Sequence, residues 1–275
     1  MALEVCSLNS GSNGNCYYIG NDQHGVLIDA GISCKETEKR LHQSNLSIKK
    51  IRCIIISHEH TDHIRGLEKL VLRHSIPVYI TQPTYKVSRL NLPESYIRDF
   101  STYASFMVED LEIIPIKKSH DAADPYSFVI KNNNVAVGVF TDIGKVSENL
   151  QQSFSLCNAV FLESNYDYEM LKNGPYPIHL QKRISGGSGH LSNLQALSLL
   201  EQHASPFLTH VFLSHLSEKN NHPDIVMDTF SRFTKKMDIS IASRYGASEV
   251  YRILGSQEFV LKNFKRKMIQ MKMFD

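Results

Sequence analysis

A run of seven residues, 57–63, reads Ser-His-Glu-His-Thr-Asp-His and contains four side chains that commonly bind metal ions. His58 and His60 alternate, so on an extended segment their side chains share one face. Asp62 and His63 follow at once and can reach a neighbouring point as the chain bends. Imidazole and carboxylate groups at this density suit one or two borderline divalent cations. We therefore expect a metal site here, although a lone histidine would more often be packed or solvated.

The residues on either side of this run indicate how it is held. Residues 53–56, Cys-Ile-Ile-Ile, are apolar and mostly β-branched, which predicts a short buried strand. Ile64, Leu67, Leu70 and Val71 recur at helical spacing and predict an amphipathic helix. The histidine run then lies in a strand-to-helix turn, where several polar side chains can face one cleft.

Three more candidate ligands come directly after strands that the sequence predicts. His120 follows residues 111–116, Asp142 follows residues 135–140, and His215 follows residues 210–213. Each position alone would be an ordinary polar strand end. Strand ends at one edge of a sheet can nevertheless project their side chains into a shared cleft, so we add these three to the candidate site.

Length and composition limit the class of protein. The 275 residues can bury a full core, and the formal net charge of +2 is too small to indicate nucleic-acid binding by itself. Five cysteines without a CxxC pair favour reduced thiols in a cytoplasmic protein over a disulfide framework. The N-terminus lacks the features of a signal peptide, and no apolar run approaches a membrane span. The oligomeric state is left open.

The order of predicted elements indicates an α/β fold with two stacked sheets and helices outside both, a four-layer αββα sandwich. Serine caps at Ser33 and Ser192, each with Glu or Gln three residues on, predict helices running to about residues 43 and 200. A further helix is predicted over 224–235. Strands are predicted at residues 3–8, 16–19, 26–28, 53–56, 78–80, 111–116, 126–130, 135–140, 159–162, 210–213 and 239–241. We expect a single domain over residues 1–275, with a short excursion containing one helix at 166–189 and a basic segment at 255–275.

The His-x-His-x-Asp-His pattern resembles the metal-binding signature of the metallo-β-lactamase superfamily. Further stretches resemble the YycJ/WalJ group of bacterial proteins with this fold, and the similarity runs from residue 3 to about residue 248. These stretches are residues 10–16, 29–31, 163–167, 189–193 and 213–217. The group is similar to the nuclease branch that includes tRNase Z and RNase J, and its members are regarded as DNA exonucleases that act from the 5′ end.

The resemblance implies a ligand set for two metal ions. One ion would be held by His58, His60 and His120, and the second by Asp62, His63 and His215. Asp142 would bridge the two ions together with a water or hydroxide. An aspartate at this position, where many lactamases of this fold have cysteine, favours harder ions such as zinc or manganese, with iron as a further candidate.

His190 has a separate possible role, because it follows a glycine run and precedes the helix capped by Ser192. Free N–H groups at a helix N-terminus attract anions, and an imidazole there could protonate a departing alkoxide oxygen. His190 also matches the histidine to which the tRNase Z pattern assigns leaving-group protonation. The alternative is a residue that only packs before the helix. We also expect Asp62 to orient the attacking hydroxide.

Two cations bridged by a hydroxide suit the in-line displacement of a phosphodiester. We therefore expect a metal-dependent nuclease, by resemblance a DNA exonuclease working 5′ to 3′, with DNA preferred over RNA as its partner. The interval from Asp142 to His215 has no room for the inserted domain of RNase J, and 166–189 is shorter than a tRNA-gripping arm. The alternatives are a hydrolase of a thioester, lactone or cyclic phosphodiester, and a non-hydrolytic regulatory or redox metalloprotein.

Candidate substrate contacts lie around this predicted site. Lys182 and Arg183 in the excursion, or the basic cluster near the C-terminus, could follow a phosphate backbone, although a solvated face is an equally good account of the C-terminal cluster. That cluster consists of Lys262, Lys265, Arg266 and Lys267. Plausible contacts at the rim are Ser12, Asn13, Ser164 and Asn165.

Overall fold

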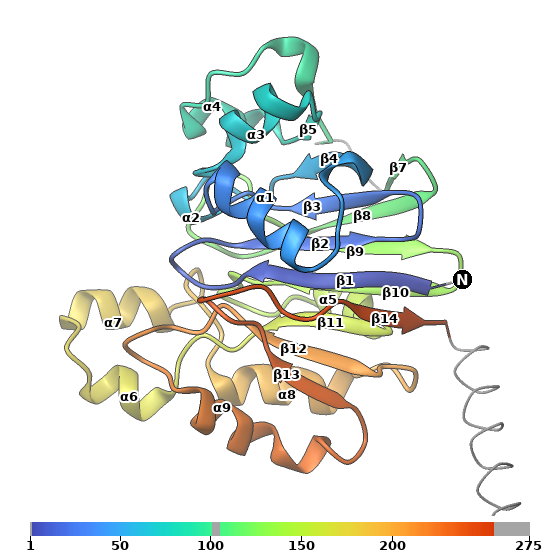
Figure 1. Cartoon of the computed structure of the whole chain (residues 1–275). Helices are drawn as coiled ribbons and strands as arrows, with labels where there is room; N and C mark the ends of the chain where they lie inside the picture. Colours follow the sequence, from blue (N-terminus) through green and yellow to red (C-terminus); the bar gives the residue numbers. More distant parts are fainter. Residues whose placement is uncertain (1, 101–104, 256–275) are drawn as a thin grey trace, which may run out of the picture.

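The computed structural model describes residues 2–100 and 105–255 and contains two seven-stranded sheets that stack face to face (Figure 1). Strand order is β14-β1-β2-β3-β4-β5-β6 in the first sheet and β13-β12-β11-β10-β9-β8-β7 in the second. Helices cover the outer face of each sheet. The α/β sandwich expected from the order of elements is therefore confirmed.

The first sheet combines an antiparallel meander, β1 to β3, with the parallel strands β3 to β6, and β14 adds to its β1 edge. Its strands are β1 (Ala2–Asn9), β2 (Cys16–Gly20), β3 (Gly25–Ile28), β4 (Ile51–Ile55), β5 (Val78–Tyr79), β6 (Ile97–Arg98) and β14 (Tyr251–Leu254).

The second sheet has the same plan, because antiparallel β7 to β10 are followed by parallel β10 to β13. Its strands are β7 (Phe106–Val108), β8 (Leu111–Lys117), β9 (Tyr126–Asn132), β10 (Val135–Phe140), β11 (Ala159–Glu163), β12 (His210–Ser214) and β13 (Asp238–Ile241). The predicted hairpin across residues 132–134 is present as β9 and β10.

The helices are short and lie between strands. Those of the first half are α1 (Cys34–Gln43), α2 (Thr61–Ile64), α3 (Leu67–His74), α4 (Gln82–Ser88) and the 3₁₀ turns η1 (Ile48–Lys50) and η2 (Glu94–Tyr96). Those of the second half are α5 (Glu148–Phe154), α6 (Tyr168–Asn173), α7 (Ile178–Ser185), α8 (Asn193–His203), α9 (Pro223–Phe230) and η3 (Ser231–Phe233). Ser33 caps α1, and Ser192 with Gln195 forms the predicted capping box of α8. None of the helices in the described part of the chain is long and apolar enough to cross a membrane.

The sheets are buried on both faces, and alternate residues of one strand therefore enter different cores. Leu3 and Val5 of β1 lie in the core between the sheets, whereas Cys6 and Leu8 pack beneath the helices of the first sheet. A third cluster lies under α5, α8 and α9 on the second sheet. Burial on two faces explains why these strands have nearly continuous apolar sequences.

The structure corrects four details of the predicted elements. The helix expected after the histidine run is divided at Gly66, where a Cβ atom would lie 1.9 Å from the carbonyl oxygen of Ile32. The excursion at 166–189 has two helices, α6 and α7, because Asp167 and Pro177 each begin one. The helix predicted over 224–235 ends at Phe230 and continues as η3. Strands β6, β7 and β14 were not predicted.

Candidate metal centre

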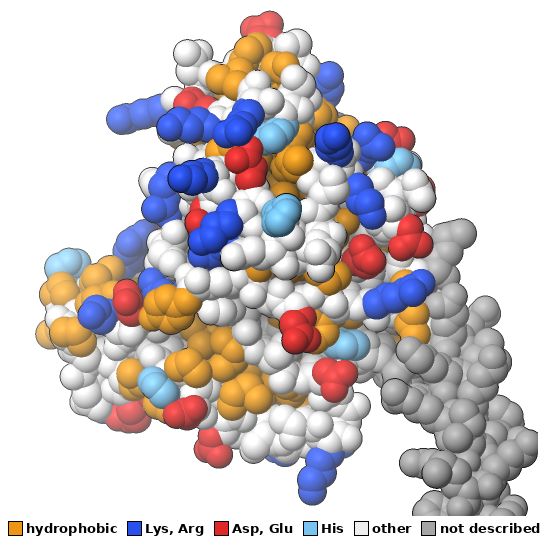
Figure 2. Space-filling model, in the orientation of Figure 1, with side chains coloured by type: hydrophobic (Ala, Val, Ile, Leu, Met, Phe, Trp, Pro, Cys, Tyr) orange, Lys and Arg blue, Asp and Glu red, His pale blue; other side chains and the backbone are white. Residues whose placement is uncertain are grey.

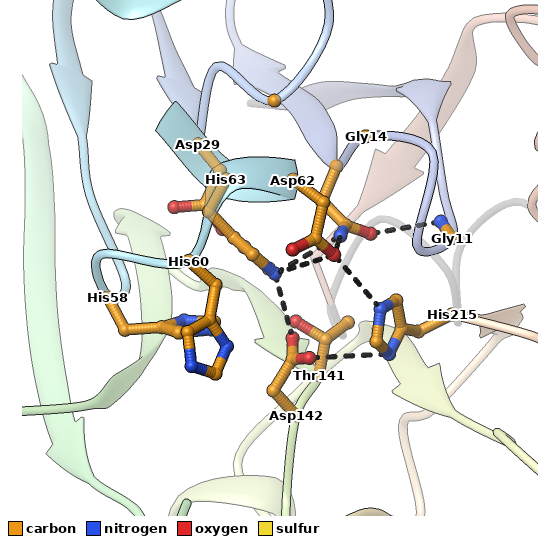
Figure 3. A network of polar contacts seen from close by, with 12 residues as sticks. Gly11, Gly14, Asp29, His58, His60, Asp62, His63, Thr141, Asp142 and His215 are labelled. Carbon is orange, nitrogen blue, oxygen red and sulfur yellow. Dashed lines mark hydrogen bonds and ion pairs between the residues drawn. The ribbon is translucent and has the colours of Figure 1, made fainter. Parts of the chain in front are cut away.

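The seven candidate metal ligands come together at one edge of the two sheets. The run 57–63 connects β4 to α2, and the other three residues follow β8, β10 and β12. In Figure 3, Asp62, His63, Asp142 and His215 point toward one another, and His58 and His60 lie beside them. Residues that are up to 157 positions apart (215 − 58) thus meet in one cluster.

His58, His60 and His120 form the first group of ligands. His58 Nε2 lies 3.0 Å from His60 Nδ1. The ring centre of His120 is 4.9 Å from that of His58 and 5.1 Å from that of His60. One nitrogen from each of the three histidines lies within 4.8 Å of the others. Three imidazole nitrogens at this spacing can hold one divalent ion such as zinc.

Asp62, His63 and His215 form the second group, again with one ligand atom each within 4.8 Å of the others. Asp62 Oδ2 is 3.5 Å from His63 Nε2 and 3.6 Å from His215 Nε2. Asn15 Nδ2 donates a hydrogen bond to the same carboxylate oxygen at 3.1 Å and fixes its position.

Asp142 lies between the two groups. Its Oδ2 is 3.5 Å from His63 Nε2, and its Oδ1 is 3.3 Å from His215 Nδ1 and 4.0 Å from His120 Nε2. It is also within 4.8 Å of a nitrogen of His58. One carboxylate with an oxygen toward each group is the arrangement that a bridging ligand requires.

The pattern of unsatisfied atoms fits metal binding. His120 Nε2, Asp142 Oδ2 and His215 Nε2 are buried, yet none of them makes a hydrogen bond in the described part of the chain. A buried polar atom without a partner usually costs about 1–3 kcal/mol. Cations bound by these atoms would remove that cost, so the residues present fit a pair of divalent ions.

The charges of the cluster also favour a cation. Burial, helped by neighbouring His63 and Lys118, lowers the pKa of His58 well below its usual value. Burial likewise lowers the pKa of His120 to about 4. Both imidazoles are therefore neutral near pH 7, which is the form that binds a metal.

The carboxylates of the cluster are ionised. Burial would raise the pKa of Asp62, but His63 and His215 outweigh burial and hold that pKa well below its ordinary value. His215 and His63 do the same for Asp142. The carboxylates in turn outweigh burial and raise the pKa of His63 well above its usual value and that of His215 to about 10. Without a metal these two imidazoles carry positive charge, and a bound cation would take the place of their protons.

Residues that the sequence analysis did not select hold the ligands in place. Asp29, which follows β3, accepts hydrogen bonds from the backbone N–H and the hydroxyl of Ser57, both at 2.8 Å, and pairs with His63 Nδ1 at 2.7 Å. The Gly189 carbonyl lies 3.0 Å from His120 Nδ1. In each histidine this contact leaves Nε2 for the metal. The strand-end position that identified Asp142 would also have identified Asp29.

Backbone conformation turns the chain sharply at these strand ends. Asp29, Asp142 and His215 have positive φ angles of 62°, 55° and 57°. This left-handed region is uncommon for residues with a side chain and is often found where a site is held by its surroundings. Gly31 is required for another reason, since a Cβ there would lie 1.6 Å from the carbonyl oxygen of Asp62.

His190 lies beside the cluster and pairs with a second residue that the sequence analysis did not select. Its Nδ1 is 2.8 Å from Oε1 of Glu163, the last residue of β11. The same oxygen is 3.0 Å from His215 Nδ1. Burial would raise the pKa of Glu163, but His190 and His215 lower it to about 2, so the carboxylate is charged.

The candidate substrate contacts are in different environments. Ser12 and Asn13 are exposed on the β1–β2 loop. Ser164 and Asn165 are buried: the Ser164 hydroxyl donates to Asn193 Oδ1 at 2.7 Å, and Asn165 Nδ2 donates to the His215 carbonyl at 2.8 Å. The prediction of a rim contact therefore suits Ser12 and Asn13 better, while Asn165 supports the loop of His215 and Ser164 contacts the first residue of α8.

The two basic residues of α7 also differ from each other. Both are exposed, but Arg183 places Nε and Nη2 each 2.6 Å from Asp121 Oδ2, next to His120. Arg183 thus ties α7 to the metal cluster. The C-terminal cluster, Lys262, Lys265, Arg266 and Lys267, lies outside the described residues.

Comparison with known sequences reveals a family and relatives. Residues 10–143 match the family described as the metallo-beta-lactamase superfamily. The chain is 33% identical over 248 residues to exodeoxyribonuclease YycJ of Bacillus anthracis, covering 89% of this chain and 94% of that protein. It is 27% identical over 241 residues to exodeoxyribonuclease WalJ of Streptococcus pneumoniae, covering 85% and 89%.

Comparison with solved structures shows the same fold. The metallo-beta-lactamase fold protein YhfI from Bacillus subtilis superposes with a TM-score of 0.68 at 16% identity, covering 91% of this chain and 99% of that protein. The short form of human tRNase Z gives a TM-score of 0.60 at 16% identity, covering 90% and 99%. At these identities the likeness concerns the fold alone.

Proposed function

We propose that this chain, which belongs to the metallo-beta-lactamase superfamily, is a dinuclear metal-dependent exonuclease that acts on DNA from the 5′ end. The observation that carries the proposal is the meeting of two ligand groups with Asp142 between them. The exodeoxyribonucleases to which the chain is similar over most of its length support the choice of substrate.

The proposed centre holds two divalent ions, zinc or manganese, with iron as a further candidate. His58, His60 and His120 would hold one ion, Asp62, His63 and His215 the second, and Asp142 would bridge them. When bound, such ions activate a water molecule at neutral pH and neutralise the phosphate oxygens of an in-line displacement. We assign to Asp62 the further task of orienting the attacking water, because Asn15 and its neighbouring histidines fix its carboxylate.

His190 is the proposed general acid. Glu163 pairs with its Nδ1 at 2.8 Å, so the proton on this nitrogen faces the carboxylate and the other ring nitrogen, Nε2, can carry a proton to the substrate. The side chain of His190 is 21% exposed, which lets a leaving group approach it. The contact with Glu163 fixes the orientation of the ring, as a general acid requires.

The experiment that tests the function compares labelled nucleic acids directly. Metal-loaded protein is incubated with 5′-labelled and 3′-labelled DNA and RNA, each single- and double-stranded. Our proposal predicts that a 5′ label is released from DNA as short products at the earliest times, while a 3′ label passes through a ladder of shortening strands.

Other results would redirect the assignment. Internal cuts would show an endonuclease, and faster degradation of RNA would change the substrate. Turnover of a thioester, lactone or cyclic phosphodiester without cleavage of DNA or RNA would replace the nuclease by a small-molecule hydrolase. Metal-loaded protein that hydrolyses none of these would favour a regulatory or redox role.

A further inference from the structure

A pocket of about 250 Å³ opens next to the proposed metal centre and takes no part in it. Leu216, Pro223, Ile241 and Ala242 supply its apolar lining. The chain between β13 and β14 contributes Arg244 and Tyr245 to the same pocket. In Figure 2, hydrophobic side chains gather on the face that includes β13 and α9, consistent with an apolar recess in this part of the molecule.

Two contacts connect the pocket wall to the metal centre. The backbone N–H of His215, a candidate ligand, donates to the Ser10 hydroxyl at 2.8 Å, and Ser10 lines the pocket. Ser10 in turn donates its backbone N–H to the Ser243 carbonyl at 3.1 Å. Figure 1 shows the β13–β14 connection beside the β1–β2 loop. The pocket wall is therefore one hydrogen bond away from a candidate metal ligand.

Arg244 lines the pocket and has an unused hydrogen-bond donor. Its Nη2 lies 3.3 Å from Glu218 Oε2, which holds the guanidinium, while its Nη1 is buried and makes no hydrogen bond in the described part of the chain. The side chain is 15% exposed. A buried guanidinium nitrogen without a partner is unfavourable unless a ligand accepts a hydrogen bond from it.

Tyr245 is an exposed aromatic ring on a fixed backbone. The side chain is 79% exposed, yet its backbone N–H donates to Ser243 Oγ at 3.0 Å and its carbonyl accepts from Arg40 Nη2 at 3.4 Å. The guanidinium carbon of Arg244 lies 6.0 Å from the centre of this ring. A large aromatic ring held in this way loses little freedom when a planar ligand stacks on it.

We propose that this pocket binds the base of the nucleotide next to the scissile phosphate. Tyr245 stacks on one face of the base, and the guanidinium group of Arg244 donates to an acceptor on its edge. Every natural base has a hydrogen-bond acceptor on its edge and two apolar faces, so this site is tolerant of sequence. The apolar lining does not suit a phosphate group, which would need several donors. The inference rests on the proposed nuclease function.

Direct binding measurements test the pocket without requiring any cleavage. The probes are the four deoxynucleoside 5′-monophosphates and 2-deoxyribose 5-phosphate, titrated into metal-loaded protein and followed by calorimetry. The phosphate and sugar are common to all five probes. The ratio of nucleotide affinity to sugar-phosphate affinity therefore measures the contribution of the base alone. We expect the nucleotides to bind about tenfold more tightly than the sugar phosphate, the usual effect of one stacked base. Tyr245→Ala should reduce this ratio to about threefold or less, and Tyr245→Phe should preserve it.

Matched variants show whether the effect is local. Phe207→Ala removes another exposed aromatic ring, 45% exposed, from the α8–β12 connection and should leave the ratio unchanged. Arg244→Lys should also reduce the ratio, because a lysine does not reproduce the position of Nη1. The proposal that the pocket binds a base would be overturned by either of two results. One is equal affinity of the wild-type protein for nucleotide and sugar phosphate, and the other is an unchanged affinity ratio in Tyr245→Ala.

A kinetic experiment separates this inference from the proposed function. Tyr245→Ala should lower kcat/KM about tenfold on ordinary DNA, and much less on DNA with an abasic site at the nucleotide beside the scissile bond. An equal loss on both substrates would contradict base binding. If the wild-type protein cleaved neither substrate but still bound nucleotides tenfold more tightly than the sugar phosphate, the nuclease function would be refuted. Base binding by the pocket would still be supported.

Discussion

Asp29 Oδ2 lies 2.7 Å from His63 Nδ1, and both side chains are completely buried. The two residues are 34 positions apart in the chain and follow two neighbouring parallel strands, β3 and β4. The contact determines which ring nitrogen of His63 faces the other ligands. Asp29 would therefore act on the proposed metal centre by positioning His63, without contacting the metal itself.

The first prediction concerns this contact. Asp29→Ala should weaken metal binding about 10- to 100-fold, the usual effect of losing the outer partner of a histidine ligand. The variant should also be less stable, because the N–H and hydroxyl of Ser57 lose a buried acceptor. Competition with a chelator measures the first effect, and thermal unfolding with excess metal measures the second.

Asp110→Ala is the matched control for Asp29→Ala. Asp110 Oδ1 lies 3.0 Å from His24 Nδ1, so it also forms an aspartate–histidine pair, but a partly exposed one outside the cluster. Its loss should leave metal affinity unchanged. If Asp29→Ala and Asp110→Ala bound metal equally well, the positioning role of Asp29 would be wrong.

The second prediction is the metal content. Seven candidate ligands exceed what one tetrahedral ion uses, so the protein should contain close to two divalent ions per chain by elemental analysis. Asp142→Ala should reduce occupancy of both sites, because its carboxylate lies between the two ligand groups. His60→Ala should reduce mainly the first site. Full occupancy in Asp142→Ala would disprove the bridge.

The parts of the site that the sequence predicts are those with a local signal. The run at 57–63 is contiguous, and His120, Asp142 and His215 each follow an apolar strand that periodicity identifies. Their shared position could be inferred because strand ends meet at one edge of a sheet. Their assignment as metal ligands remains a prediction, as does the single domain over residues 1–275.

Features that depend on tertiary contacts could not be predicted in the same way. The helical pattern is interrupted at Gly66 because its N–H donates to the Ala30 carbonyl at 2.8 Å and the Asp62 carbonyl accepts from Asn15 at 2.7 Å, both outside the helix. Glu163 is the end of an apolar strand, and its pairing with His190 depends on a loop that returns 27 residues later. Strand β14 has only four residues and pairs with β1, which lies at the other end of the chain. No local sequence pattern predicts this pairing.

The third prediction separates the two basic residues of α7. Lys182 is exposed and free to contact a phosphate, so Lys182→Ala should weaken DNA binding and reduce the slope of log affinity against log salt by about one. Binding is measured by fluorescence anisotropy with labelled DNA over a range of salt concentrations. An unchanged slope would remove Lys182 from the path of the substrate.

Arg183→Ala should behave differently, because this side chain is already paired with Asp121. Its loss frees the carboxylate of Asp121, which lies 3.4 Å from His120 Nε2, and should change metal affinity more than it changes the salt slope. Asp121→Asn should weaken the same ion pair by removing the charge of the other partner. A salt slope that falls by one in Arg183→Ala, with metal affinity unchanged, would assign Arg183 to the substrate instead.

The last prediction concerns His190 and Glu163. If His190 protonates the leaving oxygen, His190→Ala should keep its metals and lower cleavage about 10²- to 10⁴-fold, the usual range for a general acid. A p-nitrophenyl phosphodiester has a leaving group that needs no proton, so it should be cut with a much smaller loss. Glu163→Gln should show the same difference between substrates to a lesser degree, because an amide oxygen is a weaker acceptor than a carboxylate and holds the His190 ring less firmly. Equal losses on both substrates would mean that His190 positions the phosphate, and loss of metal from His190→Ala would make it a support of the site.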